Sequence, residues 1–375
     1  MNLKNTDYLC QYASCIPVKG YQRGVIYDVH RKNHFIVPLS LIDIMKKAKD
    51  FSFMELSSMF PEEKDILLEY YQFLIDNDIC FLCAKEDIQH YPPLNLEYDV
   101  PYHITNAIIE LNNFDANQAE FIFQQLKELL CPHIQFFFNK TISTEDVHCL
   151  LSLTKTSSIK TIDILMPFSN TVDDNGLKDI IKENLRLLKV TFYNSPKSKY
   201  TRYNNSTIAY VAENISVLNC GKINPSYFLV NIPFFTESHS FNNCLNRKLC
   251  IDSKGNVKNC IAMNESFGNI YDDSCSLKDI IQDNNFQKYW NICKDKVDVC
   301  KDCEFRYMCS DCRCYLKEPE NIYSQPLNCK YNPYICKWEG EEGCISIDEC
   351  GDYTSTGFVP NEEKIRSLNE QLSVE

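Results

Sequence analysis

Cysteines provide most of the chemistry that this sequence could support. Fourteen of the 21 cysteines fall between Cys244 and Cys350. Eight of them form a pattern that runs Cys244-x5-Cys250-x9-Cys260, then Cys300-x2-Cys303-x5-Cys309-x2-Cys312, and ends at Cys329. Because a Cys-x2-Cys turn places two thiolates on one side of a metal cluster, this spacing predicts metal ligation. Eight thiols suffice for two four-cysteine iron–sulfur clusters.

The two halves of the pattern are expected to supply two 4Fe-4S clusters. One set is Cys244, Cys250, Cys260 and Cys312, and the other is Cys300, Cys303, Cys309 and Cys329. In bacterial ferredoxins, too, the last cysteine of a run serves the other cluster. Structural zinc is one alternative, and mainly free or disulfide-bonded cysteines are another. Lys301, Arg306 and Arg313 would compensate the negative charge of the clusters, unless they are ordinary solvated side chains.

The composition fits a folded chain of two or three domains. The 375 residues are 44% apolar and 12% aromatic, which is enough for at least one substantial core. The first residues lack the apolar segment of a secretory signal, and no apolar run is long enough to predict a membrane span. The expected compartment is therefore the cytoplasm, where dense cysteines indicate metal rather than disulfides. A net charge of −13 argues against nucleic acid as a partner.

Residues 1–90 are expected to form a small winged-helix-like domain. The expected elements are strands at 24–29, 34–37 and 79–83, a helix capped by Ser40, and a helix that opens at Pro61 and runs through Asp76. Turn residues between the first two strands predict a hairpin. Ser is a good N-cap and Pro a good first-turn residue, which is why the helices are expected to begin there.

Residues 95–235, after a Pro-containing linker, alternate between strand-like and helix-like segments. The expected strands are 104–111, 134–138, 159–166, 187–193 and a last one at 228–232, and the expected helices are 116–130, 144–153 and 177–183. Strands that alternate with helices favour a parallel sheet, so we expect an α/β fold with an open sheet or partial barrel. Residues 351–375 are an acidic tail, expected to be a short exposed helix or disordered.

The order of the cysteines resembles the SPASM domain, the auxiliary-cluster module of many radical SAM peptide-modifying enzymes. That pattern has a cysteine, a glycine-x4-cysteine, Cys-x2-Cys-x5-Cys-x3-Cys and a last cysteine; Gly255, Cys260 and the run from Cys300 to Cys309 match it. The resemblance implies a SPASM iron–sulfur domain at 240–350. Two residues precede Cys312 where three are usual, so Cys314 is an alternative ligand.

The local sequence sharpens this resemblance over about residues 240–340. The segments are Lys301-Asp-Cys-Glu-Phe-Arg306, Cys309-Ser-Asp-Cys-Arg313 and Asn328-Cys-Lys-Tyr-Asn-Pro333, with Trp338. They resemble the SPASM maturases of grasp-with-spasm systems, which combine an ATP-grasp ligase, a short precursor peptide and the SPASM protein. The resemblance implies a maturation factor for a ribosomally synthesised, graspetide-type peptide, with that ligase as a partner.

A working radical SAM enzyme needs Cys-x3-Cys-x2-Cys after the first strand of its barrel. The corresponding stretch, 108–117, holds no cysteine, and the triplet occurs nowhere else in the chain. The resemblance therefore implies that 95–235 is a degenerate radical-SAM-like partial (βα) barrel, and no S-adenosylmethionine is expected. The chain also lacks a Gly-rich phosphate loop and a His-Glu-x2-His motif, and no catalytic residue is assigned.

The N-terminal domain resembles the elements that bind leader peptides in such pathways. A precursor's leader peptide would add as a strand beside the hairpin near 25–37 and against the helix that opens at Pro61. A non-catalytic leader-binding adaptor with structural metal sites is the alternative function. A third possibility is an autonomous redox enzyme with an unrecognised substrate.

Several cysteines lie outside the eight-residue pattern. Cys80 and Cys83 could form a redox pair or half of a metal site, but their apolar neighbours favour buried structural cysteines. Cys336, Cys344 and Cys350 have no assigned role, although the last two could hold a third metal ion.

Overall fold

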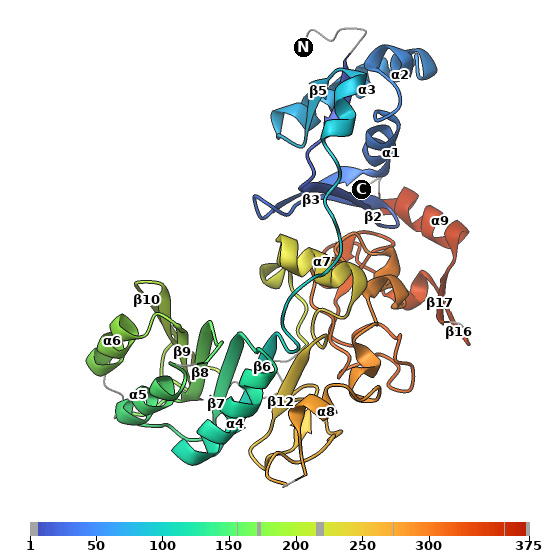
Figure 1. The fold of residues 1–375 in the computed structure, drawn as a ribbon. Helices are drawn as coiled ribbons and strands as arrows, with labels where there is room; N and C mark the ends of the chain where they lie inside the picture. Colours follow the sequence, from blue (N-terminus) through green and yellow to red (C-terminus); the bar gives the residue numbers. More distant parts are fainter. Residues whose placement is uncertain are drawn as a thin grey trace. The chain divides into compact units, whose positions relative to one another are not determined.

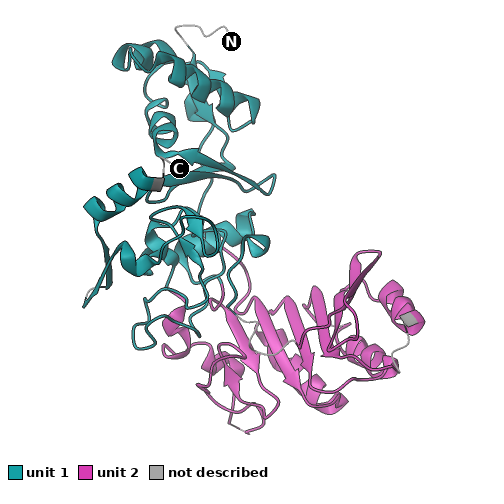
Figure 2. Ribbon diagram, turned by 180° about the vertical axis from the view of Figure 1, so that it is seen from behind, with its two compact units in different colours: residues 1–98, 221–243, 292–375 teal, residues 99–220, 244–291 magenta. Residues whose placement is uncertain are grey.

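The computed structural model describes residues 7–155, 157–170, 174–214, 221–272, 274–355 and 357–372. The chain divides into two compact units, which are coloured separately in Figure 2. Unit 1 combines residues 1–98, 221–243 and 292–375, and unit 2 combines residues 99–220 and 244–291. The cysteine-rich stretch is therefore shared: Cys244, Cys250 and Cys260 belong to unit 2, and the cysteines from Cys293 onward belong to unit 1.

The N-terminal part of unit 1 is a small antiparallel sheet with helices on one face (Figure 1). The sheet has the order β2 (Cys15–Lys19), β3 (Arg23–Asp28), β4 (Asn33–Pro38), and β1 (Tyr8–Gln11) pairs with β5 (Cys80–Cys83). The helices are α1 (Leu39–Lys47), α2 (Phe53–Met59), α3 (Lys64–Asp76) and the 3-10 helix η1 (Lys85–His90). Ile26 and Val37 pack against the helices, whereas Val25 and Tyr27 face a second core on the other side of the sheet.

The predicted strands of this part are confirmed, but the predicted helix starts are wrong. Helix α1 begins at Leu39, and Ser40 lies inside it, with its hydroxyl 2.7 Å from Tyr70 Oη. Helix α3 begins at Lys64 rather than Pro61. The reason is an additional helix, α2, which Ser52 caps with a reciprocal contact from Glu55, so the chain must turn before α3 can start.

Unit 2 is built on an eight-stranded, mostly parallel sheet, which confirms the predicted α/β class. The order is β10 (Lys199–Tyr203), β11 (Ser206–Tyr210), β9 (Leu187–Tyr193), β8 (Thr161–Pro167), β7 (His133–Phe138), β6 (Asn106–Leu111), β12 (Lys248–Ile251) and β13 (Val257–Lys258). Strands β10 and β13 at the two edges run antiparallel to their neighbours. The register places Ile109 beside Phe136 and Phe136 beside Ile164, and all three side chains are buried.

Helices pack on one face of this sheet, as Figure 1 shows for α4, α5 and α6. They are α4 (Ala116–Glu128), α5 (Thr144–Leu153), α6 (Asp174–Glu183) and the short α8 (Leu277–Ile280), followed by the 3-10 helix η4 (Phe286–Tyr289). Asp115 caps α4, and Ser143 forms a capping box with Asp146 at α5. The buried residues Ile122 and Leu126 of α4 join the core of the sheet. The three helices predicted between 116 and 183 are confirmed.

The rest of unit 1 consists of short elements and turns. They are η3 (Pro225–Tyr227), α7 (Ile232–Ser240), η5 (Lys294–Lys296), η6 (Cys300–Asp302), β14 (Tyr331–Asn332), β15 (Lys337–Trp338), η7 (Ile347–Glu349), β16 (Gly351–Thr354), β17 (Gly357–Pro360) and α9 (Glu362–Leu372). The strand predicted at 228–232 is wrong, because Asn231 caps α7 and Pro233 stands in its first turn. Helix α9 is not fully exposed, since Ile365 packs against Phe358. Among the described helices, none has the length and apolar character needed to cross a bilayer.

Candidate metal centre

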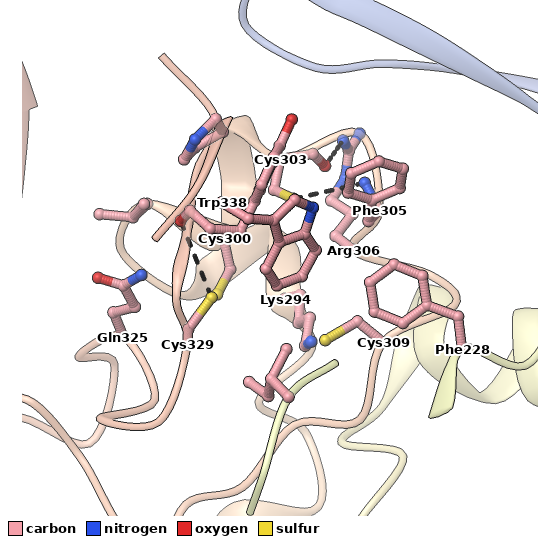
Figure 3. A pocket seen from close by; sticks show the side chains of 14 residues that line it. Phe228, Lys294, Cys300, Cys303, Phe305, Arg306, Cys309, Gln325, Cys329 and Trp338 are labelled. Atoms are coloured by element: carbon pink, nitrogen blue, oxygen red, sulfur yellow. Dashed lines mark hydrogen bonds between the residues drawn. The ribbon is translucent and has the colours of Figure 1, made fainter. Parts of the chain in front are cut away.

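Four of the predicted ligands line one pocket of unit 1. They are Cys300, Cys303, Cys309 and Cys329, and the pocket that they line is partly open to solvent (Figure 3). The first two come from η6 and the residue after it, the third from the turn that follows Met308, and the fourth from the turn before β14. The pocket therefore collects the complete second set of predicted cluster ligands.

Local backbone geometry holds the Cys-x2-Cys turn. The Cys303 N–H donates to the Cys300 carbonyl at 3.0 Å, and the Phe305 N–H donates to Cys303 Sγ at 3.4 Å. Val299 precedes the turn with a φ of +65°, which is strained for a β-branched residue. Strain of this kind concentrates at functional sites, and hydrogen bonds to cysteine sulfurs tune iron–sulfur clusters. Both features fit a ligand turn.

The rest of the pocket wall is mostly aromatic and aliphatic. Phe228, Phe305, Tyr331 and Trp338 form a ring-to-ring series, with the centroids of Phe228 and Phe305 5.3 Å apart and those of Tyr331 and Trp338 4.9 Å apart. The ring of Tyr331 also contacts that of Phe305 at 5.1 Å. An apolar shell of this kind restricts solvent access to a metal site and lowers the local dielectric constant.

Burial raises the pKa of the Cys300, Cys303 and Cys329 thiols. Neighbouring thiolates add to the shift, because negative charge on Cys329 also raises the pKa of Cys300 and Cys303. Since ligation requires thiolates, metal binding at this pocket must displace protons. Metal affinity at this site should therefore decrease as the pH falls.

A buried lysine stands beside these thiols. Lys294 is 3% exposed, its Nζ donates to the Ser310 carbonyl at 3.0 Å, and Figure 3 shows its amine next to the Cys309 sulfur. Burial by itself would lower the pKa of Lys294, but the neighbouring Cys309 and Cys300 thiolates and the Asp311 carboxylate raise it overall. Lys294 could not be recognised from the sequence, where nothing distinguishes it from a surface lysine between Cys293 and Asp295.

The three predicted counter-charges occupy different environments. Arg306 lines the pocket, where its Nη1 donates to the Cys303 carbonyl at 2.9 Å and its Nε pairs with Asp295 at 2.8 Å. Arg313 is buried and forms an ion pair with Asp311. Lys301 is exposed to solvent.

The first predicted ligand set is divided between the two units. In unit 2, Cys250 lies on β12 opposite Lys258 of β13, and Gly255, with a φ of +86°, lies in the turn between these two strands. Burial raises the pKa of Cys250, and the nearby Cys260 thiolate raises it further. Cys244, Cys250 and Cys260 are thus in one unit, and two of these thiols are close enough to interact electrostatically.

Cys312, the fourth member of that set, is in unit 1. It is 5% exposed, and a Cβ added to Gly221 would come within 2.8 Å of its sulfur. Cys314, the alternative ligand, is half-buried. The closure of the first cluster across Cys260 and Cys312 or Cys314 remains a prediction.

Two other groups of cysteines lie in unit 1. Cys10 and Cys83 are hydrogen-bonded to each other across β1 and β5, and burial raises the pKa of Cys80 beside them. Near the C-terminus, Asn332 Nδ2 donates to Cys350 Sγ at 3.4 Å, and Cys344 is close enough to raise the pKa of Cys350. Within the described part of the chain, no three His, Cys, Asp or Glu side chains are arranged around a single metal ion.

No family model matches the chain, and no curated protein matches its sequence. The assignment of a metal centre therefore depends on the residues of the pocket. Four thiols, a backbone N–H aimed at one sulfur, an apolar wall and a buried lysine fit an anionic iron–sulfur cluster with four cysteine ligands. An anionic cluster in this pocket would add to the negative charge that the Asp311 carboxylate already places near the buried Lys294.

Proposed function

We propose that this protein is a maturation factor for a ribosomally synthesised, graspetide-type peptide. In this proposal it carries two auxiliary 4Fe-4S clusters, works in the reducing cytoplasm and acts with an ATP-grasp ligase that links side chains by ester or amide bonds. The observation that supports it most is the meeting of Cys300, Cys303, Cys309 and Cys329 at one pocket. Their order along the chain is also that of the SPASM pattern.

The proposal assigns separate tasks to the parts of the chain. Cysteine-ligated clusters supply Lewis acidity or electron transfer. Cys300, Cys303, Cys309 and Cys329 would hold one of them, while Lys294 balances its charge and the aromatic wall keeps water away. We regard the parallel sheet of unit 2 as a degenerate radical-SAM-like barrel, since the segment from β6 to α4 has no cysteine to bind a catalytic cluster.

In this proposal the N-terminal sheet and helices bind the leader peptide. Strand β4 is an edge strand, so its outer backbone groups are available to pair with an added strand. Ile66, Tyr70 and Phe73 lie along one side of α3, and they are half-buried or exposed. Phe73 packs on Phe35 of β4 at 5.9 Å, which places this stripe beside the strand. We therefore assign a winged-helix-like, peptide-recognition role to this region.

Replacing Ile66 by lysine should weaken leader binding about tenfold or more. Ile66 is 49% exposed, so the fold does not depend on it, but a docked peptide would cover it. Burial of an Ile side chain contributes roughly 1.5–3 kcal/mol, and about 1.4 kcal/mol corresponds to a factor of ten in Kd. Fluorescence anisotropy with a labelled synthetic leader of the precursor encoded beside this gene measures the effect.

Leu68→Lys is the matched control for this prediction. Leu68 is 39% exposed on the opposite side of the same helix, so the same chemical change there should alter Kd by less than about twofold. Equal losses of affinity in the two variants, or no loss in either, would show that the peptide binds elsewhere on the protein. Circular dichroism of both variants checks that α3 is intact.

Anaerobic reconstitution of the full chain should give about eight iron and eight sulfide per molecule, as two four-cysteine clusters require. Iron and acid-labile sulfide are measured colorimetrically on protein purified without oxygen, with the broad visible absorbance of the clusters as a second readout. Tightly bound zinc without sulfide would contradict the proposal.

One observation favours the alternative of a leader-binding adaptor with structural metal. The rear face of the peptide-binding sheet packs directly on the cysteine loop: Arg23 of β3 pairs with Glu304 at 2.7 Å, and Tyr27 Oη donates to the Glu304 carbonyl at 2.6 Å. A metal that only folds this loop would still support the peptide-binding surface. The cysteine variants considered in the Discussion separate the two functions.

A further inference from the structure

Among the described residues, no carboxylate forms an ion pair with Lys294, although Asp311 lies close enough to raise its pKa. Its side chain is 3% exposed, and its Nζ donates to a neutral acceptor, the Ser310 carbonyl, at 3.0 Å. The carboxylate in its neighbourhood, Asp311, already forms a buried ion pair with Arg313 and accepts from Asn242 Nδ2 at 2.9 Å. A buried ammonium without its own counter-ion is costly.

The position of the amine explains why this cost is tolerated. Lys294 lines the same pocket as the four thiols and lies beside the sulfur of Cys309 (Figure 3). We propose that Lys294 is a positioning residue for the pocket cluster, donating a hydrogen bond to the Cys309 thiolate and holding the reduction potential of the cluster high. This inference rests on the proposed function, because it requires a cluster in the pocket.

A positive charge beside the cluster should favour its reduction. Four thiolates and an oxidised core are doubly negative, and a one-electron donor such as dithionite adds one further negative charge. A fixed positive charge in an apolar pocket stabilises the reduced form more than the oxidised form. Removing it makes reduction less favourable, so the potential must fall. Net charge, hydrogen bonds to the sulfurs and burial determine the reduction potential of an iron–sulfur cluster.

The experiment is a redox titration of the reconstituted full chain, followed by electron paramagnetic resonance. In Lys294→Met, one of the two reduction waves should move to a lower potential by at least 59 mV, which is a tenfold change in a one-electron equilibrium. The other wave should stay in place. Lys301→Met removes a positive charge from the Cys300-x2-Cys303 turn. Because Lys301 is exposed to solvent, this variant should shift the potential by less than about a third as much as Lys294→Met.

Each other outcome has a defined meaning. A shift in Lys294→Met no larger than that in Lys301→Met overturns the inference. If Lys294→Met lacks the iron of one cluster, the Lys294→Arg variant is measured next. A wild-type iron content in Lys294→Arg supports the requirement for a positive charge, and loss of iron from both variants overturns the inference. Iron and sulfide in the wild-type protein are measured first. Their absence defeats the proposed function itself, whereas their presence with an unchanged potential defeats this inference alone.

Discussion

Replacing both Cys303 and Cys309 by serine should remove about half of the iron and sulfide from the reconstituted protein, because one of two four-thiolate sites is lost. The two residues belong to the same pocket set, whereas Cys244, Cys250 and Cys260 lie in the other unit. About four iron and four sulfide should therefore remain. Metal analysis of anaerobically reconstituted protein measures the effect, and near-ultraviolet circular dichroism reports whether the aromatic wall of the pocket stays ordered.

Cys336→Ser is the matched control for the double variant. Cys336 is half-buried in the same unit and outside the pocket lining, so its replacement should leave the iron content unchanged. Wild-type iron in Cys303→Ser/Cys309→Ser would remove these residues from the ligand set. The same protein also separates the two functions. If it is folded and still supports full peptide modification with the ligase, the cluster has no catalytic role and the adaptor function is favoured.

The structure places Cys300, Cys303, Cys309 and Cys329 at one pocket, and the sequence could suggest this grouping because ligand spacing is a local property. Cys300, Cys303 and Cys309 lie within ten residues of one another, so their spacing alone keeps the three thiols close together. The parallel sheet could also be predicted from the sequence, since alternating strands and helices are compatible with few sheet topologies. Lys294 was not accessible from the sequence. Its burial depends on a pocket closed by Cys329 and Trp338, which are far from it along the chain.

The errors in the fold have similar physical causes. Ser40 has the chemistry of an N-cap, yet Pro38 already fixes the extended backbone that precedes α1, and the hydroxyl contacts Tyr70 instead. The apolar run that begins at Phe228 looks like a strand, but it supplies side chains to the pocket wall and then enters α7 through Asn231 and Pro233. In each case a tertiary contact or a competing cap decides the element, and neither is visible in local periodicity.

The second large effect should come from the ion pair that joins the N-terminal sheet to the cysteine loop. Glu304, between Cys303 and Phe305, has a fully buried side chain, and Arg23 pairs with it at 2.7 Å. Tyr331 Oη also donates to the same carboxylate, whose second oxygen has no hydrogen-bond partner among the described residues. Because the carboxylate depends on so few donors, loss of the arginine leaves a poorly compensated buried charge.

Arg23→Met should lower the free energy of unfolding of unit 1 by about 3 kcal/mol. Breaking a buried ion pair typically costs 3–5 kcal/mol, and the lower end applies because Tyr331 continues to donate. Urea unfolding of the full chain, followed by tryptophan fluorescence in a Trp290→Phe background, measures the change. In that background Trp338, which contacts Tyr331 at 4.9 Å, is the single tryptophan and reports on unit 1.

Two further variants test whether the effect of Arg23→Met comes from the lost charge or from the lost packing of the arginine stem. In Arg23→Met/Glu304→Gln the buried charge is gone and Tyr331 can still donate to the amide oxygen, so the double variant should be more stable than Arg23→Met alone. Lys19→Ala removes a half-exposed pair with Asp43 and should cost less than about 1 kcal/mol. A double variant no more stable than Arg23→Met would instead assign the effect to lost packing against Phe305, whose ring lies 5.7 Å from the guanidinium carbon.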